Sequence, residues 1–482
     1  MKIINIAVSR AQAVFRYPFL LSPSAFFSWA LVVGYNVVEY ACVSILITFY
    51  TQEAMQDRLA EAALLLCLQE GLASFAAIIL VHFTRERFGH RFFAIVISTG
   101  SYIAGIMVLW SYARQEHQEK NMPLFLVISL LFALGKGGAH PLLKSFLEHN
   151  LCECNNIRSL KAQSNEAEIK RAEICKNIWV QSSWIVGATV AIFGFMELPW
   201  VRVFHISAIV MTSSGLLFLF GSNSTGHIGQ SSVHKDATKV PKRVISVKWL
   251  LMFSCIAFSL VLATGNVFFQ EQGTKMKLPG IKKEEDVRFS FMIVIKSAVN
   301  EITILIFWIC GANKKQGITL VRIGTGMLCA IICCVIAWKV EIERKKVVNI
   351  DKDPRTSVAW LCPHYVLLGI VEGLAQSGLE ELLADEDEIE TLMNPGRLSK
   401  DMVSCFGKIL GIPCILIVRW WFENFNKDEA HLDRYYVMLA IFTFVFFCIY
   451  LCVAFVYMKL VPEDKEQEGG GIVEVGSEST RV

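Results

Sequence analysis

The stretch YYVMLAIFTFVFFCIYLCVAFVYM, residues 435–458, contains no charged side chain and decides the fold class. A helix needs about 20 predominantly apolar residues to cross roughly 30 Å of hydrocarbon, and this run is long enough. Comparable runs recur along the whole chain. They lie near residues 27–50, 60–83, 92–112, 123–146, 177–196, 201–221, 248–270, 289–310, 317–338, 357–383, 400–418 and 435–458. The sequence therefore predicts an all-α integral membrane protein of about twelve transmembrane helices.

The composition supports this class and argues against several others. Of the 482 residues, 54% are hydrophobic and 18% are charged, whereas a typical soluble domain carries about 25% charge. The net charge of +3 gives no reason to expect a nucleic-acid partner. Most of the 15 cysteines lie inside apolar runs, where a thiol behaves as a small hydrophobic group. Neither a disulfide framework nor a cofactor or metal site is expected.

A hydrophilic stretch from Ser222 to Ser246 divides the apolar runs into six and six. The predicted organisation is a six-helix bundle over residues 1–222, a cytoplasmic linker over 223–246, a second six-helix bundle over 247–460 and a disordered tail over 461–482. In the first half, Lys and Arg concentrate in the loops that an N-inside topology places in the cytoplasm; the second half reverses this bias. Because the first half usually dominates orientation, both termini are predicted to be cytoplasmic.

Two six-helix bundles suggest the architecture of the major facilitator superfamily, and short motifs narrow the resemblance. These motifs are ALGKGGAHPLLKSF at 133–146, QEQGTKM at 270–276, GITLVRIGTGM at 317–327, PHYVLLGIVEGLAQSGLEELL at 363–383 and WFENFNKDEAHLDRYYVMLA at 421–440. In this order they resemble segments of the plant nitrate and peptide transporters, which belong to the proton-dependent oligopeptide transporter (PTR/POT) family. The resemblance extends from about residue 27 to 459. It implies a secondary transporter of a small solute such as nitrate or a short peptide.

The chain departs from the family pattern at the residues linked to proton coupling. The family's first helix normally carries Glu-x-x-Glu-Arg, and an ungapped alignment through LITFYT (46–51) places Val32, Tyr35 and Asn36 at those ionisable positions. In the fourth helix, the family's lysine before proline corresponds to His140. The chain is therefore a divergent member, and coupled and uncoupled transport both remain open.

The fourth predicted helix carries a basic stripe. Lys136, His140 and Lys144 follow at intervals of four residues, which places them on one face. Since a charge within the membrane is costly unless it is paired or hydrated, Lys136 and His140 are predicted to bind the anionic group of a substrate. Alternatively, Lys136 and Lys144 extend along the helix and bond to carbonyl groups near its ends.

The predicted tenth helix contains Glu372, Glu380 and Glu381. The resemblance places Glu381 at the family's substrate-site glutamate, where it would bind a proton, a substrate amine or a lysine of the opposite bundle. The alternative is an ion pair that only holds two helices together. Glu380 is predicted to be such a structural partner.

Other charges within the predicted helices are interpreted differently. Lys296, Glu301 and Lys408 are predicted to pair within the second bundle. Glu70 follows no family pattern, but its place in the second helix allows it to face a cavity.

Glu39 is the only acidic residue in the first helix, and it lies four positions after Tyr35. Four residues make about one helical turn, or ~6 Å along the axis, on nearly the same face. A carboxyl displaced by one turn can still reach the same cavity, so Glu39 is the predicted proton-coupling residue. The alternatives are that Glu39 only pairs with another helix, or that transport runs without a proton.

The leading prediction is a secondary active transporter of a small anionic or zwitterionic solute, working by alternating access in the plasma or vacuolar membrane. Its partners would be the solute, the lipid bilayer and, if coupled, protons; no oligomeric state is indicated. The alternatives are an uncoupled facilitator and a non-transporting solute sensor. No Gly-x-Ser-x-Gly, His-Glu-x-x-His or Cys-x-x-Cys motif occurs, so an enzyme is not expected.

Overall fold

The computed structural model describes most of the chain as helix. The described residues are 23–55, 58–84, 88–115, 121–154, 166–195, 198–222, 242–274, 276, 290–310, 316–350, 357–383, 395–423 and 431–469. Residues 223–241 of the predicted linker and 470–482 of the predicted tail lie outside these ranges. Residues 461–469, predicted to belong to a disordered tail, instead continue the last helix.

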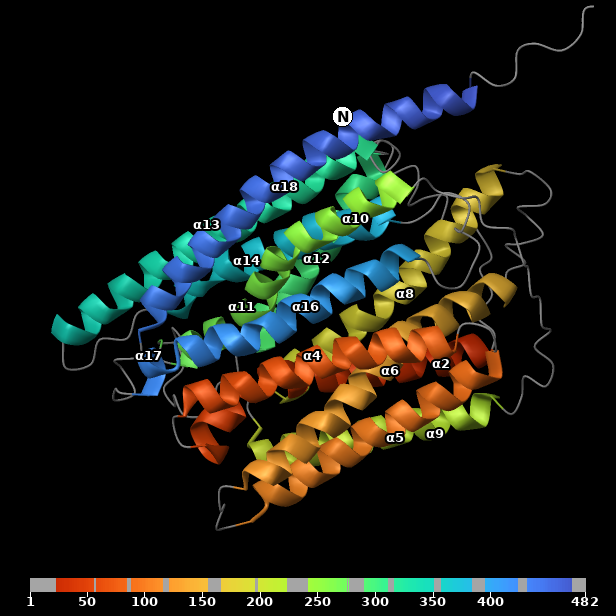
Figure 1. The fold of residues 1–482 in the computed structure, drawn as a ribbon. Coiled ribbons are helices and arrows are strands. Elements are labelled where there is room, and N and C mark those ends of the chain that lie inside the picture. Colours follow the sequence, from red (N-terminus) through yellow and green to blue (C-terminus); the bar gives the residue numbers. More distant parts are fainter. Residues whose placement is uncertain are drawn as a thin grey trace, which may run out of the picture.

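The first group of helices is drawn in red to yellow-green in Figure 1. It consists of α2 (Pro23–Ala41), η1 (Val43–Ile45), α3 (Leu46–Phe49), η2 (Tyr50–Ala54), α4 (Leu59–Phe83), α5 (Phe88–Ala113), α6 (Met122–Cys154), α8 (Glu166–Phe195) and α9 (Trp200–Ser222). The short segments η1, α3 and η2 continue α2 into one span, Pro23–Ala54. Within this group α4 and α5 pack on α6, while α8 and α9 pack on α2.

The second group is drawn in green to blue (Figure 1). It consists of α10 (Lys242–Ser254), α11 (Ile256–Thr274), α12 (Ser290–Cys310), α13 (Gln316–Ile350), η4 (Val358–Leu361), α14 (Cys362–Val371), η5 (Glu372–Gln376), α15 (Ser377–Leu383), α16 (Pro395–Ile417), α17 (Trp420–Glu423) and α18 (Leu432–Gly469). The segment η5 is a turn of π-helix between α14 and α15, a local widening that often occurs at functional sites.

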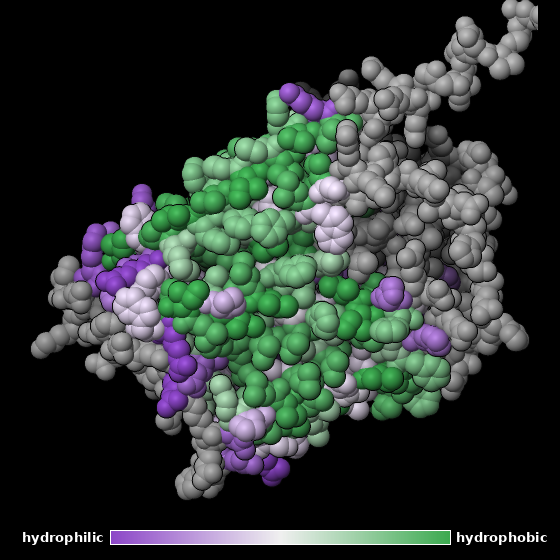
Figure 2. Space-filling model, viewed as in Figure 1, coloured by the Kyte–Doolittle hydropathy of each residue, from purple (hydrophilic) through white to green (hydrophobic). Residues whose placement is uncertain are grey.

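Ten helical segments among the described residues are long and apolar enough to cross a membrane. The remaining two predicted spans, 289–310 and 400–418, coincide with α12 and α16, which carry charged residues within the helix. Figure 2 shows hydrophobic residues across the broad middle of one face and hydrophilic residues gathered at the end where α17 lies. Large apolar side chains also point outward, such as Phe193, which is 86% exposed. The prediction of an all-α membrane protein is confirmed.

The two groups meet along α4 and α16, which lie side by side at the centre of Figure 1. Here α4 contributes Gly71, and a Cβ on this glycine would lie 3.0 Å from Cγ1 of Ile409 on α16. The thiol of Cys405 donates to the carbonyl of Gly71 over 3.6 Å. The two bundles are therefore in close contact near the middle of these helices.

Glycines of α6 allow equally close packing inside the first bundle. A Cβ on Gly137 would overlap the carbonyl oxygen of Ala73 on α4, and one on Gly135 would lie 2.6 Å from Cβ of Tyr102 on α5. These glycines therefore allow the helix backbones to approach closely. Their spacing brings α6, and with it Lys136, against α4.

We expect Gly137→Ala to destabilise the protein by about 1–3 kcal/mol, because the added methyl group must push α4 away from α6. Gly100 on α5 provides the matched control, since nothing lies within 4 Å of its Cβ position. Gly100→Ala should be neutral or stabilising by up to about 1 kcal/mol, the usual gain in helix propensity. Thermal unfolding midpoints of the two purified variants check this, and equal midpoints would contradict the packing assignment.

Candidate functional site

Lys136 of α6 lies between two carboxylates of the first bundle. Its Nζ is 2.9 Å from Oε1 of Glu39 on α2 and 2.6 Å from Oε1 of Glu70 on α4. The three side chains each retain about a quarter of their surface exposed, 25% for Lys136, 27% for Glu39 and 28% for Glu70. They are therefore paired, yet they border accessible space instead of lying in the packed core.

A fourth charge joins this group from the other bundle. Nζ of Lys408 on α16 lies 3.1 Å from Oε2 of Glu70 and 3.1 Å from the hydroxyl of Ser74, both on α4. The predicted pairing of Lys408 within the second bundle is therefore wrong. The four side chains of Glu39, Lys136, Glu70 and Lys408, here called the charged quartet, alternate in sign and cross from one bundle to the other.

Aromatic residues hold the Glu39 side of the quartet in place. The hydroxyl of Tyr102 on α5 donates to Oε2 of Glu39 over 3.5 Å, a long contact. The ring of Tyr102 lies 4.9 Å from that of Tyr35, whose hydroxyl bonds to Thr99 at 3.1 Å. Tyr35 thus fills the position of the family's second glutamate with an uncharged, hydrogen-bonded side chain.

Glu39 and Lys136 are each displaced by one turn from the positions that the family resemblance assigns. Glu39 follows Tyr35 by four residues, and Lys136 precedes His140 by four. The first and fourth spans run in opposite directions, so both displacements, ~6 Å each, point toward the same end of the bundle. An acid and a base displaced in the same direction can contact each other, as Glu39 and Lys136 do here.

The other predicted site residues have different positions. Glu381 pairs with Arg322 of α13 at 2.9 Å, inside the second bundle, so it is not brought together with Glu39 and Lys136. The backbone of His140 lies in α6, but its side chain is outside the described part of the structure. Lys144 interacts electrostatically with Glu301 of α12 in the second bundle. The substrate-binding roles of Glu381 and His140 stay predictions.

Arg322 is a residue that the sequence analysis missed. Its side chain is only 4% exposed, it donates to the carbonyl of Gly373 at 3.0 Å and to the hydroxyl of Ser377, and its guanidinium lies 4.6 Å from the ring centre of Phe307. A lone arginine inside the apolar run GITLVRIGTGM was the available signal, because such a charge requires a partner.

A second charged pair faces the first bundle from α12 and η5. Nζ of Lys296 is 3.1 Å from Oε2 of Glu372 and 3.3 Å from Oδ1 of Asn266. The neighbouring Ser297 accepts a 3.0 Å hydrogen bond from the hydroxyl of Tyr40 on α2. Lys296 therefore pairs within its own bundle, as predicted, although with Glu372.

Glu380 is also ion-paired, in agreement with its predicted structural role. It binds Lys400 of α16 at 3.0 Å. Among the described residues, no group of His, Cys, Asp and Glu is arranged to hold a metal ion. The site offers ion pairs and hydrogen bonds to a solute.

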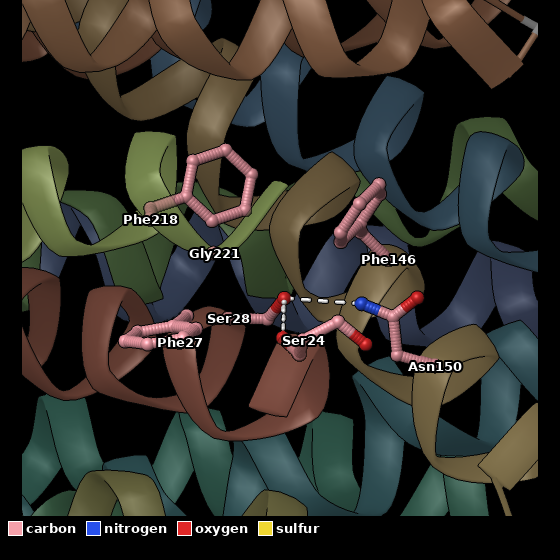
Figure 3. Close-up of a pocket in the computed structure, with 7 residues that line it drawn as sticks. All are labelled: Ser24, Phe27, Ser28, Phe146, Asn150, Phe218 and Gly221. Carbon is pink, nitrogen blue, oxygen red and sulfur yellow. Dashed lines mark hydrogen bonds between the residues drawn. The ribbon is translucent and has the colours of Figure 1, made fainter. Parts of the chain in front are cut away.

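Figure 3 shows a separate small pocket at the start of α2, lined by Ser24, Phe27, Ser28, Phe146, Asn150, Phe218 and Gly221. Its polar groups already bond to one another, since Nδ2 of Asn150 donates to the hydroxyl of Ser28 over 3.1 Å. This pocket contains no charged side chain and belongs to helix packing more than to solute binding.

Comparison with known proteins agrees with this description. Protein NRT1/PTR FAMILY 5.10 of Arabidopsis thaliana is 26% identical, over 90% of this chain and 93% of its own. Protein NRT1/PTR FAMILY 5.4 of the same plant is 30% identical over 48% of this chain and 45% of its own. No family model matches the chain.

Solved structures show the same fold at low sequence identity. An auto-inhibited POT family peptide transporter superposes with a TM-score of 0.64 and 14% identity, covering 91% of this chain and 97% of that one. A POT family transporter in complex with 5-aminolevulinic acid gives a TM-score of 0.59 and 13% identity, covering 91% and 96%.

The chain thus has the fold of the POT family transporters, with two helical bundles and charged residues paired between them. The chain is similar along most of its length to plant members of the NRT1/PTR family. These relatives support the prediction of a secondary transporter of small solutes. The solved neighbours are transporters, in line with the expectation that the chain is not an enzyme.

Proposed function

We propose that the chain is a proton-coupled symporter of a small solute that carries an anionic group, and that it works by alternating access between the two bundles. The observation that carries this proposal is the shared position of Lys136 between Glu39 and Glu70. The predicted bundles, residues 1–222 and 247–460, would rock about the linker over 223–246. Both termini would face the cytoplasm, in the plasma or the vacuolar membrane.

The charges of the quartet explain how protonation of one residue prepares the site to bind an anionic group. With all four groups ionised, the two lysines balance the two glutamates. Protonation of Glu39 removes one negative charge, so that Lys136 and Lys408 then exceed the remaining Glu70 by one positive charge. Because an uncompensated charge inside a membrane protein is costly, this state favours an incoming anionic group, and proton and solute bind together.

The same charge balance restricts the class of solute that the site can bind. A simple anion such as nitrate requires the proton in order to keep the site neutral. A zwitterion, such as an amino acid or short peptide, carries its own positive charge. The carboxylate of Glu372 in the second bundle can pair with that charge. Solved relatives have been captured with 5-aminolevulinic acid and with sulfate, ligands that carry an anionic group.

Glu39→Gln tests the proposal, because glutamine mimics the protonated acid permanently. A substrate screen in oocytes or proteoliposomes at acidic and neutral external pH first identifies a solute that wild type accumulates. We expect the variant to lose acid-stimulated accumulation, with the ratio of acidic to neutral uptake falling to about one, and to retain counterflow exchange.

Absence of acid stimulation in wild type would contradict coupling and favour an uncoupled facilitator, an alternative motivated by Val32, Tyr35 and Asn36 at the family's ionisable positions. Binding without accumulation or exchange would instead identify a sensor.

A further inference from the structure

The carboxylate of Glu70 contacts two lysines, one from each bundle. Its Oε1 contacts Lys136 of α6, and its Oε2 contacts Lys408 of α16. We propose that the cross-bundle pair Glu70–Lys408 sets the resting charge of the solute site, so that one proton on Glu39 is both necessary and sufficient to make the site bind an anionic group. This proposal rests on the proposed function and assigns Glu70 and Lys408 as positioning residues for coupling.

The location of the pair supports such a role. Glu70 and Lys408 both lie near the middle of their helices, where α4 and α16 form the main contact between the bundles. A pair needed only for packing would be expected to be enclosed, yet Glu70 remains 28% exposed and Lys408 21% exposed. Lys408 is also close enough to Glu372 to attract it electrostatically, which links the quartet to the pair formed by Lys296 and Glu372.

The ion pairs within the quartet favour Glu39 over Glu70 as the proton acceptor. Glu39 is approached by Lys136 from α6 and by the hydroxyl of Tyr102 from α5. Among the described side chains, α8 and α9, which also pack on α2, contribute no ion pair to Glu39. Other titratable groups lie within electrostatic range of the quartet or its neighbours: Tyr35, Tyr40, Cys42, Cys67, Glu301, Glu372 and Lys400. Glu70, unlike Glu39, is held by a lysine on each oxygen, so its protonation must break two ion pairs.

Counting charges gives a different expectation for each variant. Glu70→Gln leaves two lysines against Glu39 alone, so the site is positive without a proton, as in Glu39→Gln. Lys408→Gln leaves Lys136 against two glutamates, so the site is negative at rest and only neutral after Glu39 is protonated. The double variant Glu70→Gln/Lys408→Gln leaves Glu39 and Lys136, which are balanced at rest and positive after one protonation, as in wild type.

The test measures uptake and counterflow for these three variants at acidic and neutral external pH, at matched expression in the full-length protein. We expect Glu70→Gln to exchange solute with an acid stimulation ratio of about one. Lys408→Gln should lose about ten-fold or more in apparent affinity at both pH values, the scale of a lost charge-assisted interaction. The double variant should regain acid stimulation. Lys346→Gln, which breaks an exposed pair with Glu343, serves as the control and should behave as wild type.

The outcomes separate this proposal from the one on which it rests. Acid stimulation that persists in Glu70→Gln, or a double variant no better than either single one, overturns the assignment of the cross-bundle pair while leaving coupling through Glu39 in place. Equal losses in both single variants with an unchanged pH profile would show a merely structural pair. A wild type without acid stimulation overturns the proposed function itself.

Discussion

Arg344→Ala is expected to destabilise the protein by about 3–5 kcal/mol, the cost of removing one partner from a buried ion pair. Arg344 of α13 forms a two-pronged interaction with Glu341, with Nη2 to Oε1 at 2.7 Å and Nε to Oε2 at 3.0 Å. Their side chains are only 2% and 0% exposed. In the variant, Glu341 keeps the hydrogen bond from Gln272 of α11 at 2.9 Å but loses its positive partner. The thermal midpoint of the protein in detergent measures the effect.

A double variant distinguishes lost charge balance from lost packing. Glu341→Gln/Arg344→Met removes both charges, retains a carbonyl acceptor for Gln272 and keeps most of the buried volume. Since replacing a whole buried pair is often nearly neutral, this protein should recover most of the lost stability. Lys346→Gln at the neighbouring exposed pair should shift the midpoint little. A double variant as unstable as Arg344→Ala would assign the effect to packing.

The sequence predicts the helical fold well, because spanning a membrane requires long apolar runs that are visible locally. The run at 435–458 lies within α18, and the charged runs at 289–310 and 400–418 still form α12 and α16. Individual positions within helices are also informative. The sequence predicts Glu39 and Lys136 as site residues, and an ionisable group inside a membrane needs a partner.

The partners themselves could not be predicted. Helical spacing shows that Lys136 and Lys144 share one face of α6, but not what lies opposite that face. In the structure, Lys136 meets two carboxylates and Lys144 approaches Glu301. The pair Glu70–Lys408 joins residues 338 positions apart, and only the packing of α4 on α16 brings them together. A local sequence pattern shows where a charged residue lies in a helix, whereas tertiary packing decides with which opposite charge it forms an ion pair.

Lys136→Gln should have the largest functional effect of any substitution in the quartet. It leaves Glu39 without its ion-pair partner and removes the cation nearest to the proposed proton acceptor. The remaining Glu39, Glu70 and Lys408 carry one excess negative charge, which disfavours an anionic group. Losing a charge-assisted hydrogen bond of about 1.5–3 kcal/mol corresponds to a rise of about 10- to 150-fold in the half-saturation constant.

Kinetics at two external pH values separate a binding role of Lys136 from a structural one. If Lys136 binds the solute, acid should recover part of the lost affinity, because protonation of Glu39 returns the three remaining groups to neutrality. Lys136→Arg keeps the positive charge and should retain acid-stimulated uptake, although the wider guanidinium must fit between Glu39 and Glu70. Wild-type kinetics in Lys136→Gln at matched expression would assign Lys136 to helix pairing and shift attention to His140, whose role in binding stays a prediction.

The substitutions Glu39→Gln and Lys136→Gln change the charge of the site in opposite directions, since Glu39→Gln adds a positive charge and Lys136→Gln removes one. If charge balance governs the site, solute affinity at neutral pH should therefore rise in Glu39→Gln and fall in Lys136→Gln. Nonspecific damage to the bundle would instead lower the affinity of both variants.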